Sequence, residues 1–229
     1  MSVTPQRLSR PMHLVVSGPS GAGKTTIVKR LLERDRSVRL SVSVTTRRPR
    51  SRERSGREYE FVDRATFERR REAGAFVEWA EVHGQLYGTP RSGLEALRAA
   101  GYDALLDVDY QGGLAIQREL SDTVSVFLLP PSMEVLEERL RHRASDDPAE
   151  IARRLEVAAR EMAHAVHYDY VVINEAIEQA YEQVHAILVS ERWRVARIEP
   201  ETLAALARLD VRGGGAGADG GRRRSPSAG

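Results

Sequence analysis

The sequence lacks cysteine, and it has no long apolar run. Without cysteine, neither disulfide bonds nor thiolate metal sites can form among its 229 residues. No stretch approaches the ~20 apolar residues that a membrane-spanning helix needs, and the N-terminus lacks the apolar segment of a secretory signal. The six histidines show no metal-ligand spacing, and we expect His164 and His167 to be surface or packing residues. These absences favour a soluble cytoplasmic protein.

Lysine is nearly absent as well, although the chain is basic. It has 33 arginines but only two lysines, Lys24 and Lys29. The formal net charge is +2, and residues 212–229 alone contribute +3, which leaves −1 on residues 1–211. Because the positive excess lies at one end, the bulk charge does not predict nucleic-acid binding by the folded part. We expect residues 1–11 to be an extended lead-in and 211–229 a disordered Gly/Arg-rich tail, with an RNA- or membrane-touching arm as the alternative for the tail.

The most informative stretch follows the apolar run at residues 12–17. It reads Gly18-Pro19-Ser20-Gly21-Ala22-Gly23-Lys24-Thr25 and opens, through Thr26, a segment that reads as helix. Strand, glycine-rich turn and helix start together match the phosphate-binding pattern G-x-x-x-x-G-K-[ST]. Glycines let backbone N–H groups converge on an anion, lysine brings a mobile charge to the outer phosphates, and the threonine hydroxyl can bind Mg²⁺. The stretch predicts a nucleoside triphosphate site; the alternative is a Gly-rich connection that merely precedes a helix.

Apolar runs and turn residues predict strands that alternate with helices along the rest of the chain. The predicted strands are residues 12–17, 40–46, 59–62, 76–82, 103–109, 124–129 and 170–173. The predicted helices are residues 23–35, 66–73, 90–100, 113–120, 133–143, 149–166 and 175–195, and Gly84 and Gly88-Thr89-Pro90 are interpreted as turns. This alternation predicts an α/β fold with a parallel sheet covered on both faces.

Six short blocks in order resemble guanylate kinases: the phosphate-binding loop, S-x-S-x-T-T-R-x-P-R, E-Y-x-F, V-E-W, L-Y-G-T and L-D-V-D-x-Q-G. The resemblance spans about residues 12–195. It implies a P-loop three-layer α/β/α core at about 12–37, 98–137 and 167–210, an inserted GMP-binding region at 38–97 and a helical lid at 138–166. It also implies the reaction ATP + GMP → ADP + GDP with Mg²⁺, dGMP as a further acceptor, and no nucleic-acid or membrane partner.

The resemblance assigns GMP contacts to seven residues that the sequence pattern alone would interpret as solvated or core residues. The residues matched to its phosphate are Arg47, Arg50, Tyr59 and Tyr87, and those matched to guanine are Ser43, Glu78 and Thr89. Guanidinium forks suit a phosphate dianion, and a carboxylate can accept from both guanine N–H donors. The alternatives are a solvated basic loop, core tyrosines and an exposed strand carboxylate. We expect Arg48, Arg52, Arg54 and Arg57 to be solvated.

The remaining candidates surround the phosphoryl transfer itself. Asp107 and Asp109 end an apolar strand where α/β sheets bind ligands, and alternation would put both on one face. Asp107 is the candidate for ordering Mg²⁺ through water and Asp109 for the guanine side, with helix capping as the alternative for both. The resemblance matches Arg139, Arg143 and Arg154 to the catalytic lid arginines and Asn174 to an adenine-side position, although Asn174 could equally be a turn former. Arg141 and Arg153 are expected to be solvated.

Two rival functions remain open at this point. One is a guanylate-kinase-like module that has lost phosphoryl transfer and binds protein ligands. The other is a related P-loop kinase for a different phosphorylated small molecule. The intact Lys24, Thr25, Arg47, Arg50 and Arg139 argue against the first, and Ser43, Glu78 and Thr89 argue against the second.

Overall fold

The computed structural model describes residues 9–50, 53–57, 59–82, 84–143 and 147–205, without the side chains of residues 142 and 143. The strands are β1 (His13–Ser17), β2 (Val38–Leu40), β3 (Ser43–Thr45), β4 (Tyr59–Phe61), β5 (Phe76–Val82), β6 (Gln85–Pro90), β7 (Asp103–Asp107), β8 (Thr123–Leu129) and β9 (Tyr170–Ile173). The helices are α1 (Lys24–Arg34), α2 (Arg64–Glu72), α3 (Arg91–Ala99), α4 (Tyr110–Glu119), α5 (Met133–Arg143), α6 (Pro148–Met162) and α7 (Ile177–Arg192), with short 3₁₀ segments η1 (Ala163–His167) and η2 (Val195–Arg197). Within these ranges, no helix has the length and apolar character needed to span a bilayer.

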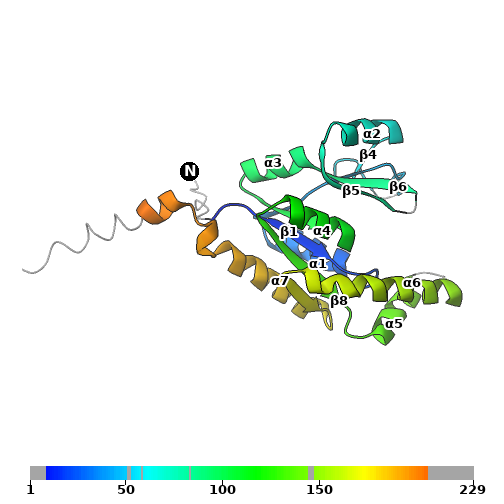
Figure 1. The fold of residues 1–229 in the computed structure, drawn as a ribbon. Coiled ribbons are helices and arrows are strands. Elements are labelled where there is room, and N and C mark those ends of the chain that lie inside the picture. Colours follow the sequence, from blue (N-terminus) through cyan, green and yellow to red (C-terminus); the bar gives the residue numbers. More distant parts are fainter. Residues whose placement is uncertain (1–8, 51–52, 58, 83, 144–146, 206–229) are drawn as a thin grey trace, which may run out of the picture.

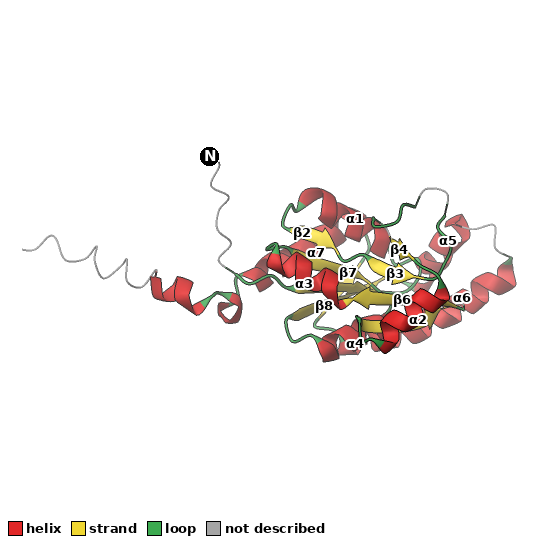
Figure 2. Cartoon of the chain, turned by 90° about the horizontal axis from the view of Figure 1, so that it is seen from above, coloured by secondary structure: helices red, strands yellow, loops and turns green. Residues whose placement is uncertain are grey.

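The core is a five-stranded sheet in the order β2-β7-β1-β8-β9, with every neighbouring pair parallel. Alternate residues of β1 face opposite layers, so that Leu14 and Val16 pack with α1 and α7, and Val15 packs with α3 and α4. Figures 1 and 2 show helices on both faces of this sheet. The predicted three-layer α/β/α core is therefore confirmed.

A second sheet of four strands, in the order β4-β3-β6-β5, forms a separate lobe with α2 (Figure 1). Only the β3–β4 pair is parallel; β3–β6 and β5–β6 are antiparallel. Phe67 of α2 stacks on Phe76 of β5 with ring centroids 4.5 Å apart, and both side chains are buried. This small core is distinct from the core of the parallel sheet, so the lobe has its own packing.

The single strand predicted for residues 40–46 is wrong. The structure divides the segment into β2, which pairs with β7 in the core sheet, and β3, which pairs with β4 and β6 in the second sheet. The Ser41 N–H still donates to the Leu105 carbonyl at 2.8 Å, so the chain leaves the core immediately afterwards. The alternation of apolar and hydroxyl residues is the same on both sides of this point, and only the partner strands separate the two halves.

The turn predicted before residue 90 is in fact β6, which forms a hairpin with β5. Gly84, at φ +74°, makes the tight turn. Gly88 lies inside this strand. A Cβ there would come within 3.0–3.1 Å of the Phe76 and Phe67 rings, so the position requires glycine. Pro90 ends the strand and is the residue before α3, rather than part of its first turn. Glycine here marks a close aromatic contact and not a chain reversal.

The chain also departs from its predicted path after β7. The strand ends at Asp107, and Asp109 is the N-cap of α4, its Oδ1 accepting from the Gly112 N–H at 2.8 Å. The expectation that alternation puts both aspartates on one face of a strand is therefore wrong. The helix begins at Tyr110, three residues earlier than predicted, because this cap satisfies a free N–H of the first turn.

Candidate active site

The glycine-rich turn joins β1 to α1 and is packed from three sides. At Gly21, φ is +92° and a Cβ would lie 2.7 Å from Leu136 Cδ1 of α5. At Gly23, φ is +95° and a Cβ would lie 2.1 Å from Asn174 Nδ2. Glycine is required at both positions because L side chains rarely adopt this backbone and would also collide. The result is a closely packed turn at the N-terminus of α1, where N–H groups of the first turn and the helix dipole favour an anion.

Lys24 reaches from the start of α1 to the end of β7. Its Nζ lies 3.0 Å from Asp107 Oδ1 and donates to the Val108 carbonyl at 3.2 Å. Thr25, the next residue, lines the same cavities as Asp107. The structure thus brings the lysine, the threonine hydroxyl and one carboxylate to the carboxyl end of the parallel strands, where α/β sheets bind ligands.

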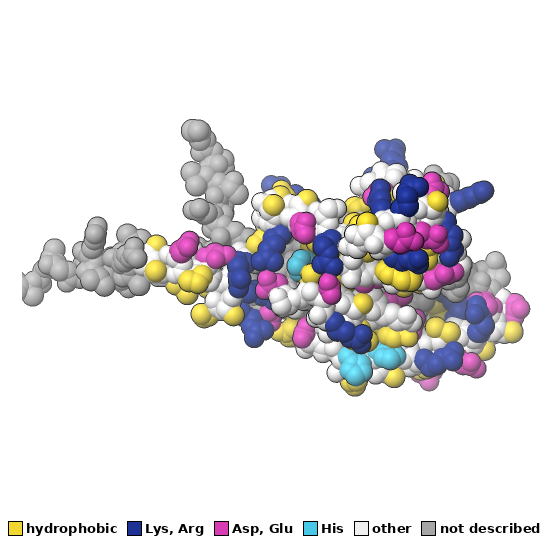
Figure 3. Space-filling model, turned by 45° about the horizontal axis from the view of Figure 1, so that its top comes forward, with side chains coloured by type: hydrophobic (Ala, Val, Ile, Leu, Met, Phe, Trp, Pro, Cys, Tyr) yellow, Lys and Arg dark blue, Asp and Glu magenta, His cyan; other side chains and the backbone are white. Residues whose placement is uncertain are grey.

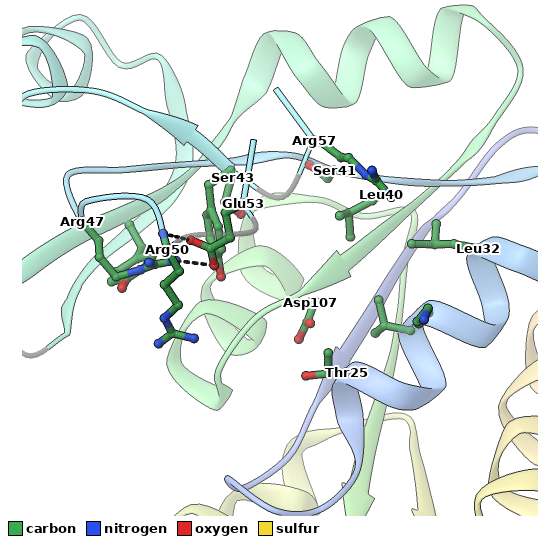
Figure 4. Close-up of a pocket in the computed structure, with 14 residues that line it drawn as sticks. Thr25, Leu32, Leu40, Ser41, Ser43, Arg47, Arg50, Glu53, Arg57 and Asp107 are labelled. Atoms are coloured by element: carbon green, nitrogen blue, oxygen red, sulfur yellow. Dashed lines mark hydrogen bonds and ion pairs between the residues drawn. The ribbon is translucent and has the colours of Figure 1, made fainter. Parts of the chain in front are cut away.

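Two cavities adjoin at this edge of the sheet, and they share Thr25, Ser43, Tyr59, Tyr87 and Asp107. The larger, of about 680 Å³, extends toward the loop after β3 and is drawn in Figure 4. The smaller, of about 320 Å³, extends toward β5 and the start of α4. Together they run from the glycine-rich turn to the second sheet, so a molecule in them would touch both lobes.

The far wall of the larger cavity carries the predicted arginines, Arg47 and Arg50. Glu53 holds this wall together: it accepts from Arg47 Nη2 at 2.9 Å and from the Arg50 N–H at 2.8 Å. The Arg47 hydrogen bond lowers the pKa of Glu53, and the same bond raises the pKa of Arg47. The Arg47 guanidinium also lies 5.4 Å from the Tyr59 ring centroid. In Figure 4 the side chains of Arg47, Arg50 and Glu53 lie across the cavity from Thr25 and Asp107.

Sequence reasoning missed two residues of this wall. Glu53 is the only acidic residue between Arg47 and Arg57, and that isolation in an arginine-rich loop could have identified it. Arg57 was expected to be solvated; it is exposed, yet it lines the larger cavity. Arg48 and Arg54 are exposed, and Arg52 lies outside the described residues.

The smaller cavity contains the predicted guanine-side residues Glu78 and Ser43, and Thr89 stands directly behind Glu78. Thr89 is fully buried and its Oγ1 donates to Glu78 Oε1 at 2.6 Å. Burial raises the pKa of Glu78, and the negative charge of Asp109 adds to that shift. The hydroxyl orients one carboxylate oxygen and leaves the other for a ligand with N–H donors.

Asp109 has two structural roles. It caps α4 and it also lines the smaller cavity, so capping and ligand contact are compatible for this residue. A further carboxyl group, Glu161 at the end of α6, was not singled out from the sequence. Burial raises the pKa of Glu161, the charge of Asp109 raises it further, and Lys24 opposes the shift. Glu161 therefore lies within electrostatic reach of both Asp109 and Lys24.

Helices α5 and α6 bring two of the predicted arginines to the glycine-rich turn. Arg139 Nη2 donates to the backbone carbonyl of Asn174 at 2.9 Å, and Arg154 Nη2 donates to Ser20 Oγ at 2.9 Å. Arg143 belongs to α5, but its side chain lies outside the described residues. Asn174 is fully buried behind the turn and donates to the Ala22 carbonyl.

The comparisons with known proteins agree with this geometry. The family model described as "Guanylate kinase" matches residues 10–191. A guanylate kinase of Myxococcus xanthus is 49% identical over 191 residues, which are 83% of this chain and 91% of that protein. A guanylate kinase of Sphingopyxis alaskensis is 50% identical over 184 residues, covering 80% of this chain and 84% of that protein.

A solved structure extends the agreement from sequence to fold. The crystal structure of guanylate kinase from Anaplasma phagocytophilum superposes with a TM-score of 0.71 at 37% sequence identity, and the match covers 88% of this chain and 96% of that chain. A family match over most of the chain, close relatives at about half identity and a shared fold lead to one conclusion. This chain belongs to the guanylate kinase family.

Proposed function

We propose that this chain is an ATP:GMP phosphotransferase, which converts ATP and GMP to ADP and GDP. The observation that carries the proposal is the pair of adjoining cavities that share Thr25 and Asp107. One extends from there to Arg47, and the other extends to Glu78. Such an arrangement can hold two anionic ligands end to end, which converts a reaction between two molecules into a local step. Family membership supports the enzyme over a protein-binding module, because the chain retains the charged residues of both ends.

On the donor side, the glycine-rich turn from Gly18 to Thr25 would bind the ATP phosphates through its N–H groups. Lys24 would follow the transferring phosphoryl group, and Arg139, Arg143 and Arg154 would neutralise the charge that develops on it. The placement of Arg154 on Ser20 and of Arg139 beside Asn174 supports this role for two of the three. No covalent enzyme intermediate is needed, because positioning and charge neutralisation account for the catalysis.

Magnesium fits the oxygen groups at this end. The Thr25 hydroxyl and the Asp107 carboxylate line the same cavities, and Mg²⁺ prefers one or two such ligands together with waters and substrate phosphates. We propose that Thr25 would bind the ion directly and Asp107 through water. The ion would supply positive charge that offsets the negative charge of the ATP phosphates. Asp107 would then exchange its contact with Lys24 for that role.

On the acceptor side, Arg47, Arg50, Tyr59 and Tyr87 would hold the GMP phosphate. Glu78 would accept from the two guanine N–H donors, Ser43 and Asp109 would complete the base contacts, and Thr89 would orient Glu78 from behind. An adenine ring would instead present an acceptor to this partly buried carboxylate, and leaving such a group unpaired under a bound base gives large discrimination. The same contacts are compatible with dGMP. We further propose a cytoplasmic reaction, since ATP and GMP are cytoplasmic metabolites.

The proposal is tested by measuring ADP formation by the purified full chain with ATP, Mg²⁺ and each of GMP, dGMP, AMP, UMP or no acceptor. We expect turnover with GMP and dGMP only. Turnover with AMP or UMP instead would favour the other P-loop kinase, and no turnover with any acceptor would favour the binding module. The Lys24→Ala variant, assayed in parallel, excludes a contaminating kinase.

A further inference from the structure

The first turn of α4 contains two adjacent glycines, and both have close neighbours. A Cβ on Gly112 would lie 3.3 Å from Glu78 Oε2, and both residues line the smaller cavity. A Cβ on Gly113 would lie 2.2 Å from the Tyr168 hydroxyl oxygen and 2.9 Å from Ser17 Oγ. The start of α4 therefore contacts the smaller cavity at one residue and two hydroxyl groups at the next.

These two hydroxyl groups hold the backbone at the start of α4. Ser17, the last residue of β1, is fully buried, and its Oγ donates to the Asp109 carbonyl at 3.2 Å. The Tyr168 hydroxyl makes a longer hydrogen bond of 3.4 Å to the Tyr110 carbonyl. Asp109 is the N-cap of α4, and Tyr110 is its first residue. The end of β1 and the residue after η1 thus hold the two residues with which α4 begins.

Tyr168 is itself held in place by its surroundings. Its side chain is buried, and its ring packs edge-on against the Phe127 ring with centroids 4.9 Å apart. Burial raises the pKa of Tyr168 to about 12, the contact with Ser17 opposes that shift, and the charge of Asp109 adds to it. The hydroxyl therefore keeps its proton at neutral pH and can donate to a carbonyl.

We infer that Tyr168 is a positioning residue for the acceptor: its hydroxyl holds the start of α4, with Asp109 and Gly112, in the place that a guanine base beside Glu78 requires. The inference rests on the proposed function, in which Glu78 and Asp109 contact the base. Tyr168 is not among the residues that line the two cavities, so it acts through α4 and not by touching the ligand.

The Tyr168→Phe variant tests this role, because it removes the hydroxyl and keeps the ring on Phe127. The KM for GMP should rise roughly three- to tenfold, the factor that corresponds to one lost hydrogen bond. The values of kcat and of the KM for ATP should stay close to those of the parent chain, since the variant weakens the binding of GMP alone. A variant that lowers kcat and weakens ATP and GMP alike would show general damage and would overturn the inference, and so would an unchanged KM for GMP.

Tyr170→Phe is the matched control. It also removes one tyrosine hydroxyl, which donates to Glu191 Oε1 of α7 at 2.7 Å and has no bond to α4. All three kinetic constants of this control should match those of the parent chain. An equal rise in the KM for GMP in both variants would overturn the inference, because the effect would then not depend on α4.

A second pair of variants tests the contact between Tyr168 and α4 directly. Gly113→Ala puts a methyl group against the Tyr168 hydroxyl, and the KM for GMP should rise more than in Tyr168→Phe. The double variant Gly113→Ala/Tyr168→Phe should recover part of this loss, because phenylalanine leaves space for the methyl group. Losses that simply multiply in the double variant would show that the two residues act independently and would overturn the inference.

The affinity for GMP without ATP, measured by calorimetry, separates this inference from the proposed function. If the parent chain binds GMP but does not phosphorylate it, the proposed function fails, and the Kd values for GMP should still follow the order expected for the KM. If the parent chain phosphorylates GMP and Tyr168→Phe binds it equally well, only the inference fails. A parent chain that does not bind GMP would overturn both.

Discussion

The two ends of the cavity system are built in different ways. The donor end is eight consecutive residues, Gly18 to Thr25, of which the last two line the cavities, and its backbone is held by buried neighbours such as Leu136 and Asn174. The acceptor end gathers single side chains from β3, the loop after it, β4, β5, β6 and the start of α4. In Figure 1 the two ends belong to different lobes of the molecule. Figure 3 shows that basic and acidic side chains are intermingled on the face in view.

The difference teaches how each end tolerates change. At the donor end, backbone N–H groups would bind the phosphates. The glycines are needed because a larger side chain would collide with its neighbours and disturb that backbone. At the acceptor end, each side chain makes its own contact, so its loss should weaken one ligand and leave the rest intact. Substitutions at the donor end should therefore affect kcat, and those at the acceptor end should affect the KM for GMP.

The largest effect is expected for Lys24→Ala. It removes the only described ammonium that contacts Asp107, and kcat should fall roughly hundred- to thousandfold, the range seen when one transition-state donor is lost. The KM for GMP should stay close to that of the parent chain. Lys29→Ala is the matched control: Lys29 lies at the rim of the larger cavity with its side chain 75% exposed, and kcat should change by less than about twofold. An unchanged kcat in Lys24→Ala would contradict the role of Lys24 in phosphoryl transfer.

Glu78→Gln should have the next largest effect, at the other end. The amide NH₂ would face the guanine N–H donors, and kcat/KM for GMP should fall by about a hundredfold or more. Thr89 can still donate to the remaining carbonyl oxygen. Because burial raises the folded-state pKa of Glu78, its ionisation costs stability at pH 8, so the melting temperature should hold or rise. Glu81→Gln, on the exposed part of the same strand, should leave both properties unchanged, and equal losses in the two variants would argue against a specific role for Glu78.

Arg47→Ala should raise the KM for GMP roughly ten- to hundredfold, because one charge-assisted contact to the phosphate is lost, and kcat should change little. Glu53→Gln should give a smaller increase of the same kind, since the glutamine no longer fixes the guanidinium by charge. Arg48→Ala is the control; it retains the backbone carbonyl that accepts from Arg47 Nη1. Steady-state kinetics with GMP as the varied substrate measure these KM values. An unchanged KM in Arg47→Ala would show that Arg47 is a solvated loop residue and does not bind the GMP phosphate.

The smallest effect is expected from pH. Glu78 must be ionised to accept two N–H donors, and its folded-state pKa lies above the ordinary value of 4.5, so GMP affinity should decline as the pH is lowered through this raised pKa. The GMP phosphate also titrates, near pH 6, but equally for every variant. The ratio of parent to Glu78→Gln affinity should therefore fall as the pH is lowered from 8 toward the ordinary carboxyl value of 4.5. A ratio that stays constant across this range would show that the charge on Glu78 does not contribute to GMP binding.

Much of the donor end could be predicted from sequence because its parts are neighbours in the chain. Strand, turn and helix start follow one another, and Gly21, Gly23 and Lys24 have their roles within one short segment. The buried strand that ends in Asp107 could be recognised for the same reason. Asp109 could not be placed, because its cap on α4 and a continued strand are equally compatible with the local residues.

Other features depended on contacts between distant segments. The division of residues 40–46 follows from two different partner sheets, and β6 follows from pairing with β5 and from the aromatic rings over Gly88. Arg57 and Glu53 enter the site because their loop folds back over the larger cavity.

By itself, the sequence determined the α/β core, the phosphate-binding turn and the kinds of charge available to two anionic ligands, since these follow from local periodicity and from residue chemistry. Only the tertiary structure decided that the chain leaves the core sheet after Ser41, that Glu53 orients Arg47, and that Asn174 lies behind the turn. Strand pairing and burial depend on contacts with segments that are distant in the sequence, so the residues of one segment do not determine them.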